Sequence, residues 1–173
     1  MKSKADKQID EIVQIFLTED IIKPKDVLAK TGYRIRHLGT GAYRKVYKFV
    51  GLPLVVKFPL SKDERDVRHS VLEFKARELI LRQWRKYEKL IRYIPDIYFL
   101  DDTEGVVLAR YYLPLHNSKL RFYEGHIAAM VGDIVDLAWT HKKHGTHDTH
   151  YENMGVDDSG QVKITDMGFF YQN

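Results

Sequence analysis

Residues 147–153 read His-Asp-Thr-His-Tyr-Glu-Asn, and thirteen residues after Asn153 the chain continues with Asp166-Met167-Gly168. Asp148 and Asn153 follow the expected end of a helix, and a hairpin with its turn at 157–160 separates them from Asp166. A carboxylate can accept the proton of an attacking hydroxyl group, while carboxylate and amide oxygens suit Mg²⁺. Asp148 can supply the first function, and Asn153 with Asp166 can supply the second.

A glycine-containing segment lies much earlier in the chain. Residues 38–46 read Leu-Gly-Thr-Gly-Ala-Tyr-Arg-Lys-Val and fall between two expected strands. Glycine allows backbone N–H groups to close over phosphate groups, because no Cβ stands in the way. An ordinary hairpin turn is the alternative for this fragment. A dinucleotide fingerprint is excluded, because a strand follows the glycines where that motif requires a helix.

Lys57 follows Val55 and Val56 in an apolar run, which predicts a largely buried ammonium group that needs an anionic partner. The alternative is a lysine on an edge strand that faces water. A long charged helix is expected over residues 63–92, with one face formed by Ile80, Trp84, Tyr87 and Ile91. Glu73 falls on the line of this face, whereas Glu78 falls with Val71 and Phe74. The spacing favours a Lys57–Glu73 pair, and Glu78 stays open as the partner.

The remaining pattern predicts an α+β fold, because strands and helices are segregated along the chain. An amphipathic first helix is formed around Ile9, Ile12, Val13 and Phe16, and a short helix at 26–30 ends at Gly32. The other expected elements are a meander of three strands over 33–58, strands at 97–100 and 106–110, a helix at 123–143, and strands at 154–156 and 162–164.

Taken together, these motifs resemble the protein-kinase-like superfamily, and the resemblance extends from about Tyr33 to the end of the chain. The motifs occur in the expected order: Gly39-x-Gly41-x-x-x-x-Val46, Val56-Lys57, a helix glutamate, Asp148-x-x-x-x-Asn153 and Asp166-Met167-Gly168. Conventional protein kinases have lysine where this chain has His150. The catalytic loop is therefore closer to those of bacterial small-molecule and atypical kinases, and the whole resembles a minimal bacterial or phage-type kinase-like domain.

The resemblance implies a bilobal fold that binds ATP and Mg²⁺. By this resemblance, Lys57 contacts the α- and β-phosphates and Glu73 positions Lys57. Asp148 is the catalytic base, and Asn153 and Asp166 bind the metal ion. The phosphates would be covered by Gly39, Thr40, Gly41, Ala42 and Val46. Residues 108–113 would form the hinge beside the adenine, with Arg110 and Tyr112 as nucleotide-contacting residues.

The same resemblance divides the chain into three parts. These are a helical extension at 1–32, a β-rich N-lobe at 33–113, and a much reduced helical C-lobe at 114–173. Arg44 stands where the third loop glycine is usual, so the loop closes less tightly or Arg44 itself meets a phosphate, and Thr149 replaces the usual leucine. Only five residues follow Asp166-Met167-Gly168, where conventional kinases have an activation segment and substrate-binding helices. Without these helices the C-lobe would expose apolar surface. We expect the aromatic tail at 169–171 to cover part of it, and the N-terminal helix or a second copy of the chain, in a homodimer, to cover more.

Two functions follow from these observations. The complete set of chemical residues favours an ATP-dependent phosphotransferase that moves the γ-phosphate of ATP to a hydroxyl group. A protein is the favoured substrate, and a small molecule is the other substrate class that stays open. The expected lack of a substrate platform supports the alternative, a catalytically weak or inactive kinase-like module that regulates a partner protein by binding.

Composition excludes several other classes. The 173 residues contain no cysteine, which excludes disulfides and thiolate metal sites, and no run of 18 apolar residues predicts a membrane span. The charged N-terminal segment lacks the pattern of a signal peptide, so a cytoplasmic protein is expected. A net charge of +4 is too small to indicate nucleic acid, although the strand at 43–48 alternates basic and aromatic residues. Zinc binding by His141, His144, His147 and His150 is disfavoured, because the expected helix ends within this series.

Overall fold

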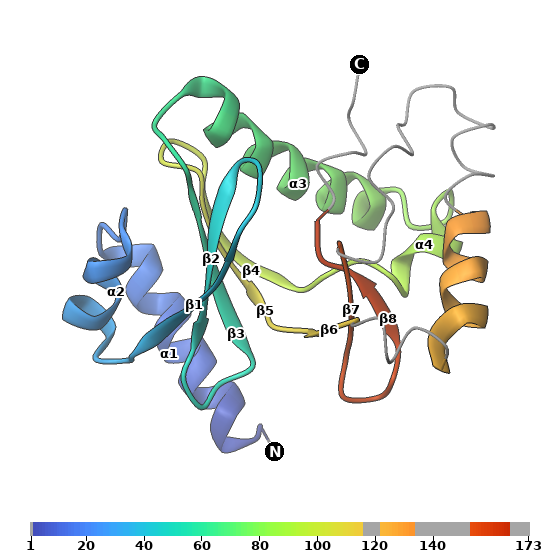
Figure 1. Cartoon of the computed structure of the whole chain (residues 1–173), viewed down its shortest axis with the longest axis horizontal. Coiled ribbons are helices and arrows are strands. Elements are labelled where there is room, and N and C mark those ends of the chain that lie inside the picture. The colour runs from blue at the N-terminus through green and yellow to red at the C-terminus, as the bar shows by residue number, and fades with distance from the viewer. Residues whose placement is uncertain (1, 116–121, 134–152, 167–173) are drawn as a thin grey trace. The chain divides into compact units, whose positions relative to one another are not determined.

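The computed structural model describes residues 2–115, 122–133 and 153–166. The chain divides into two compact units, and Figure 1 draws the elements of both. Unit 1 comprises residues 1–71 and 96–111, and unit 2 comprises residues 72–95 and 112–173. The predicted α+β class is confirmed, because antiparallel sheets and helices make up the described residues of both units.

Unit 1 is built on a five-stranded antiparallel sheet with the strand order β1-β2-β3-β5-β4. Its strands are β1 (Ile35–Thr40), β2 (Arg44–Phe49), β3 (Leu54–Pro59), β4 (Ile97–Asp101) and β5 (Val106–Arg110). The meander of three strands and the following hairpin are therefore confirmed. Because β3 lies between β2 and β5, Lys57 is on the central strand of the sheet.

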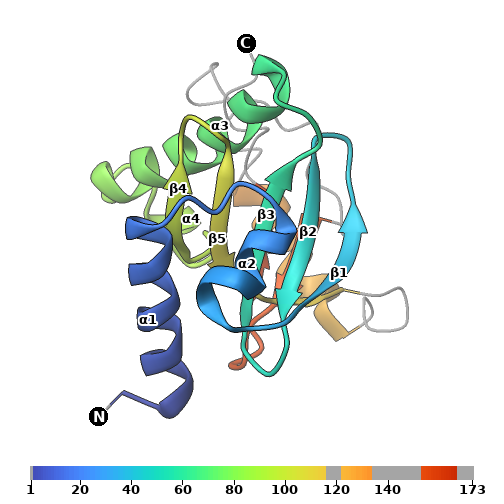
Figure 2. The same ribbon diagram turned by 90° about the vertical axis from the view of Figure 1, so that its left-hand side faces the viewer.

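Two N-terminal helices cover one face of this sheet, as Figure 2 shows. Helix α1 (Lys4–Thr18) begins at a capping box between Ser3 and Asp6, and α2 (Pro24–Thr31) ends at Gly32, whose φ of 72° suits glycine. Both predicted helices are confirmed. The apolar side of α1 packs with alternate strand residues into one core, formed by Ile9, Ile12, Phe16, Ile21, Val27, Phe49, Leu52, Leu54, Val56, Phe58, Val106 and Leu108.

The expected helix over residues 63–92 is interrupted, so that part of the prediction is wrong. Helix α3 (Glu64–Arg82) ends in a turn in which the Gln83 carbonyl accepts hydrogen bonds from the backbone N–H groups of Lys86 and Tyr87, and α4 (Glu88–Ile91) follows. The turn rotates Trp84 outward to 52% exposure, so its predicted place on the buried face is wrong, whereas Tyr87 is 1% exposed. Burial of Tyr87 and its neighbours in the core outweighs the continuity of the helix.

Unit 2 contains a small antiparallel sheet with the order β6-β7-β8 and a helix at residues 122–133. Its strands are β6 (Leu113–Pro114), β7 (Met154–Val156) and β8 (Val162–Ile164). The bounds of β7 and β8 agree with the prediction, whereas β6 was not predicted. The core of this unit is formed by Ala76, Ile80, Tyr87, Leu90, Tyr93, Ile94, Leu115, Met130, Met154, Val156, Val162 and Ile164. In the described parts of the chain, every helix is too short or too polar to cross a lipid bilayer.

Candidate functional site

The glycine-containing segment forms the β1–β2 hairpin of unit 1. Its turn is closed by a hydrogen bond from the Gly41 amide to the Arg44 carbonyl, 2.9 Å long. Neither Gly39 nor Gly41 has a positive φ, and among the described residues a Cβ on Gly39 would meet nothing within 4 Å. A Cβ on Gly41 would meet only the Arg44 carbonyl oxygen, at 3.9 Å. Packing among the described residues does not require these glycines, which is the property expected where a ligand approaches the backbone closely.

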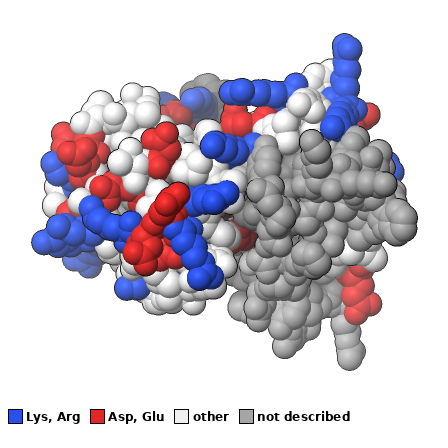
Figure 3. All heavy atoms as spheres, turned by 90° about the horizontal axis from the view of Figure 1, so that it is seen from above, with Lys and Arg blue, Asp and Glu red and all other residues white. Residues whose placement is uncertain are grey.

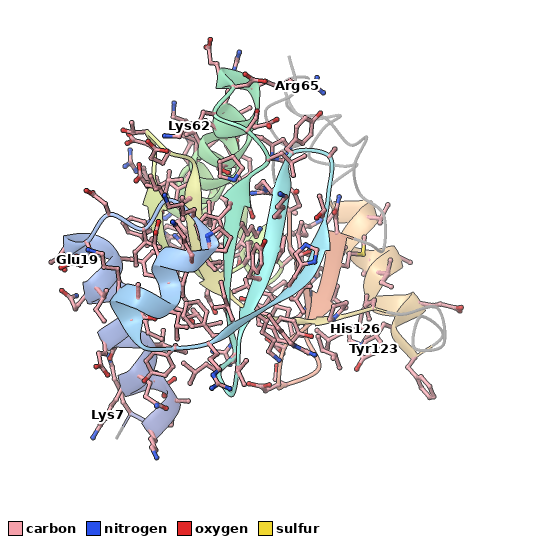
Figure 4. All side chains as sticks on the ribbon, turned by 60° about the vertical axis from the view of Figure 1, so that its left-hand side comes forward. Lys7, Glu19, Lys62, Arg65, Tyr123 and His126 are labelled. Carbon is pink, nitrogen blue, oxygen red and sulfur yellow. The ribbon has the colours of Figure 1, made fainter. Side chains whose placement is uncertain are left out.

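Tyr43, at the end of this turn, is held against the first turns of α3. Its ring stacks on His69 with 4.4 Å between the ring centroids, and the Arg65 guanidinium donates a 3.2 Å hydrogen bond to its hydroxyl group. Figure 4 labels Arg65 on α3 and Lys62 just before this helix. The contacts link the glycine hairpin to α3. Sequence reasoning missed this clamp, because no local pattern pairs residues 43 and 69.

Lys57 is 6% exposed and lies directly opposite Val46 on β2 and Val107 on β5. A central strand and an almost fully buried side chain exclude the alternative of an edge-strand lysine facing water. A buried ammonium group requires compensation by charge or by hydrogen bonds. The register also places Lys57 on the same side of the sheet as Val46, at the base of the glycine hairpin.

Glu73 is the fully buried glutamate of α3, with 0% exposure. It shares a helix face with Ala76 and Ile80, three and seven residues further on, and both are also fully buried. Glu78, the alternative kept open above, makes a 2.8 Å ion pair with the adjacent Arg77 and is partly exposed. Of the two carboxylates, only Glu73 therefore has the burial expected of a partner for a buried lysine.

Residues 110–115 lead from unit 1 into unit 2. The Arg110 amide donates a hydrogen bond to the Asp96 carbonyl. Burial raises the pKa of Tyr98, and the nearby Arg110 side chain partly offsets this rise. Arg110 pairs with Leu54, whose side chain belongs to the core under α1. The Arg110 side chain consequently points to the sheet face opposite Lys57, and only its backbone can serve a ligand on the Lys57 face. Tyr112 is 4% exposed and packs on Gly155.

The β7–β8 hairpin brings the two predicted metal ligands of unit 2 to the same end of one small sheet. Met154 pairs with Ile164, and the Thr165 amide donates a 2.8 Å hydrogen bond to the Asn153 carbonyl, so Asn153 lies opposite Thr165 and next to Asp166. Both side chains are partly exposed. An amide oxygen and a carboxylate are donors that Mg²⁺ prefers, so this pair fits the ion by its chemistry.

At the other end of the hairpin, Asp157 holds the turn together. Its carboxylate accepts hydrogen bonds from the Ser159 amide, the Ser159 hydroxyl and the Gln161 amide at 2.9, 2.6 and 2.9 Å. Partial burial raises the pKa of Asp157, but these hydrogen bonds together outweigh it, so the pKa lies below the usual value of an aspartate. Asp157 thus has a structural role in the hairpin whose open end carries Asn153 and Asp166.

Several predicted features lie outside the described residues. These are Asp148, the glycine of Asp166-Met167-Gly168, the aromatic tail at 169–171, and the four histidines considered for zinc. In residues 2–115, 122–133 and 153–166, no group of three or more histidine, aspartate or glutamate side chains is arranged to hold a metal ion.

The strand at 43–48 does not present a single basic and aromatic surface. Arg44, Val46 and Lys48 alternate with Lys45 and Tyr47, so the two sets point to opposite faces of the sheet. Figure 3 shows cationic and anionic side chains intermixed over the described residues of that view. Both features weaken the interpretation of this strand as a nucleic-acid interface.

Comparison with known proteins finds likeness in structure but none in sequence. No family model and no curated protein sequence matches the chain. Among solved structures, the chain resembles an APH(2″)-IIa protein in its ternary complex with streptomycin and ATP, with a TM-score of 0.42 and 13% sequence identity. The match covers 78% of this chain and 40% of that protein.

Proposed function

We propose that the chain is an ATP-dependent phosphotransferase that moves the γ-phosphate of ATP to a hydroxyl group. The observation that carries this proposal is the position of Lys57, a buried ammonium group on the central strand, directly opposite Val46 at the base of the glycine hairpin. This is the relation that the kinase-like motifs require between a phosphate-covering loop and a phosphate-binding lysine. The proposal assigns nucleotide binding to unit 1 and metal binding to Asn153 and Asp166 of unit 2.

In the proposed reaction, Lys57 contacts the α- and β-phosphate oxygens, and the backbone of residues 39–46 covers the phosphates. Glu73 pairs with Lys57 and fixes the position of its ammonium group. Asp148 accepts the proton of the attacking hydroxyl group. The oxygen of that hydroxyl group forms the new bond to the γ-phosphorus, while the bond from the γ-phosphorus to the β–γ bridging oxygen breaks. Mg²⁺, when bound, neutralises the charge that develops on the phosphates.

Nucleotide binding can be tested separately from catalysis by thermal unfolding with Mg²⁺–ATP. Binding to the folded protein raises the melting temperature by mass action. We expect this rise in the wild type and its loss in Lys57→Met. Lys45→Met is the matched control, because Lys45 is an exposed lysine on the other side of the neighbouring strand. An equal rise in Lys57→Met would contradict the assignment of this lysine.

Phosphate transfer is tested with radiolabelled ATP, the purified chain and a cell extract, beside Asp148→Ala and Asp166→Ala. Loss of a general base costs roughly 10²–10⁴-fold in rate, so we expect Asp148→Ala to retain ATP binding and to lose transfer by about that factor. Acid precipitation separates label on proteins from label on small molecules, and so distinguishes the two substrate classes. Undiminished transfer by Asp148→Ala would refute the mechanism, and ATP binding without any transfer would instead support the regulatory alternative.

A further inference from the structure

Two cations face each other across the β1–β2 ladder of unit 1. Arg36 pairs directly with Lys48, although like charges in this arrangement destabilise a sheet. In the described parts of the chain, neither side chain has a carboxylate within ion-pair distance. Among the described residues, the sheet therefore carries two adjacent positive charges that no carboxylate neutralises.

A β-bulge creates this pairing. The register shifts between His37 and Gly39, so Leu38 has no partner on β2 and Arg36 comes opposite Lys48. Without the bulge, the hairpin register would place His37 at that position. Bulges redirect side chains and are common beside functional sites. Here the bulge brings two like charges together where a regular ladder would separate them.

Lys48 is also held in place by an aromatic ring. Its Nζ atom lies 3.7 Å from the centroid of the Tyr111 ring, and the side chain is partly buried. Burial, and then the nearby Arg36 guanidinium, lower the pKa of Lys48 below its usual value. A cation–π contact by itself would account for the position of the lysine. It would not account for the arginine directly opposite, which adds a second charge to the same place.

The Arg36–Lys48 pair lies on the sheet face that carries Lys57. Lys48 is two residues from Val46 on β2, and Val46 is opposite Lys57, so alternation places all three side chains on one face. Two residues of strand span roughly 7 Å, so an anion at Lys48 is distinct from one at Lys57 but within the length of one nucleotide. The Arg34 carbonyl accepts a 2.9 Å hydrogen bond from the Val50 amide, so the β1–β2 pairing continues beyond Arg36. The exposed Arg34 side chain is therefore a third cation near the Arg36–Lys48 pair.

We propose that Arg36 and Lys48 form a second anion site on the nucleotide-facing side of the sheet, which binds a phosphate group. Two cations at one position match the double charge of a phosphate better than the single charge of a carboxylate. Tyr111 limits the movement of the lysine, so less conformational freedom is lost on binding. The phosphate belongs either to the bound nucleotide, as an additional group on its ribose, or to a separate phosphorylated molecule.

The test measures thermal unfolding with inorganic phosphate at constant ionic strength. We compare the wild type with Lys48→Gln, Arg36→Gln, the charge-retaining Lys48→Arg, and Lys45→Gln. Lys45 is the matched control, because it lies on the same strand with its side chain on the other face. A charged hydrogen bond contributes enough that we expect at least about a five-fold weaker apparent affinity for phosphate in Lys48→Gln and Arg36→Gln. Lys48→Arg and Lys45→Gln should match the wild type.

Lys57→Met separates this site from the proposed ATP site. We expect it to keep phosphate binding while losing the effect of ATP, whereas a loss of phosphate binding in Lys57→Met but not in Lys48→Gln would overturn the proposal. Equal affinity for phosphate in Lys48→Gln and in the wild type, with both proteins folded by circular dichroism, would also overturn the proposal. This result is independent of phosphotransferase activity, so the second site can fail or stand without the proposed reaction.

Two further titrations identify the source of the phosphate. If it is carried on the nucleotide, adenosine 3′,5′-bisphosphate should bind more tightly than adenosine 5′-monophosphate, and Lys48→Gln should abolish the difference. If it is carried on a separate molecule, inorganic phosphate should raise the melting temperature further in the presence of saturating Mg²⁺–ATP. Failure of both titrations would count against a phosphate site at Arg36 and Lys48.

Discussion

Replacing Gly155 by alanine tests whether the segment after Tyr111 is locked onto the β7–β8 hairpin. Gly155 is in the middle of β7, and a Cβ placed on it would lie 2.6 Å from the Tyr112 Cβ, and 3.3 Å from both the Leu113 carbonyl oxygen and the Thr165 Cγ2. The first distance is too short for any real contact. Since Cβ is the root of the Tyr112 side chain, a change of rotamer cannot relieve it, and the backbone of β6 or β7 must move.

The cost can be estimated from the structure. Overpacking a close contact costs about 1–3 kcal/mol, and separating β6 from β7 would weaken ladder hydrogen bonds that contribute about 1 kcal/mol each. Removal of a glycine from a strand returns roughly 0.5–1 kcal/mol through the entropy of the unfolded chain. We therefore expect Gly155→Ala to lower the free energy of unfolding by about 2 kcal/mol, which corresponds to a melting temperature about 4–8 °C lower.

The assay is urea unfolding followed by circular dichroism and by tryptophan fluorescence, whose transitions must coincide. Gly125→Ala is the matched control, because Gly125 is in the helix at 122–133 with open space around its Cβ position. That variant should be unchanged or stabilised by up to about 1 kcal/mol. A Gly155→Ala protein within about 0.5 kcal/mol of the wild type would refute the close approach of Tyr112 to β7.

Three further predictions follow from the same structure. Asp157→Asn should lower the free energy of unfolding by about 1–2 kcal/mol at neutral pH, measured by urea unfolding. Because the pKa of Asp157 is depressed in the folded state, this difference is fully present above the unfolded-state pKa of about 4 and should vanish as the pH falls through the folded-state pKa. Tyr43→Leu should speed hydrogen exchange of the hairpin amides at 39–43, whereas Tyr43→Phe, which keeps the stack on His69, should retain most of the protection. Glu78→Gln should change stability by less than about 0.5 kcal/mol, since its partly exposed ion pair with Arg77 contributes little, and a larger loss would indicate an additional role.

Most of the local structure could be predicted from the sequence, because its signals act over a few neighbouring residues. Gly32 marks the end of α2, and the turn at 157–160 separates β7 from β8 with the predicted bounds. The same hairpin made it predictable that Asn153 and Asp166 lie at one end of the β7–β8 pair. Helix periodicity failed at Trp84, because the core around Tyr87 decides where the helix breaks, and that core is assembled from distant parts of the chain.

The candidate site was predictable in its residue types and only partly in its geometry. An apolar run around Lys57 predicted burial, and the helical period singled out Glu73, both of which the structure finds buried. The clamp of Tyr43 by His69 and Arg65 had no local signal, because it joins a hairpin to a later helix. The side to which Arg110 points also depended on which strands pair, and so was not foreseen.

By itself, the sequence determined the order of the elements and the chemistry available to them, because glycine, proline and hydrophobic period act locally. Only the tertiary structure decided which side chains share a face. Strand register has a period of two, so a single unpaired residue, Leu38, changes which residue lies opposite Lys48. That choice rests on pairing across the whole sheet, and it places Arg36 beside Lys48 on the face that carries Lys57.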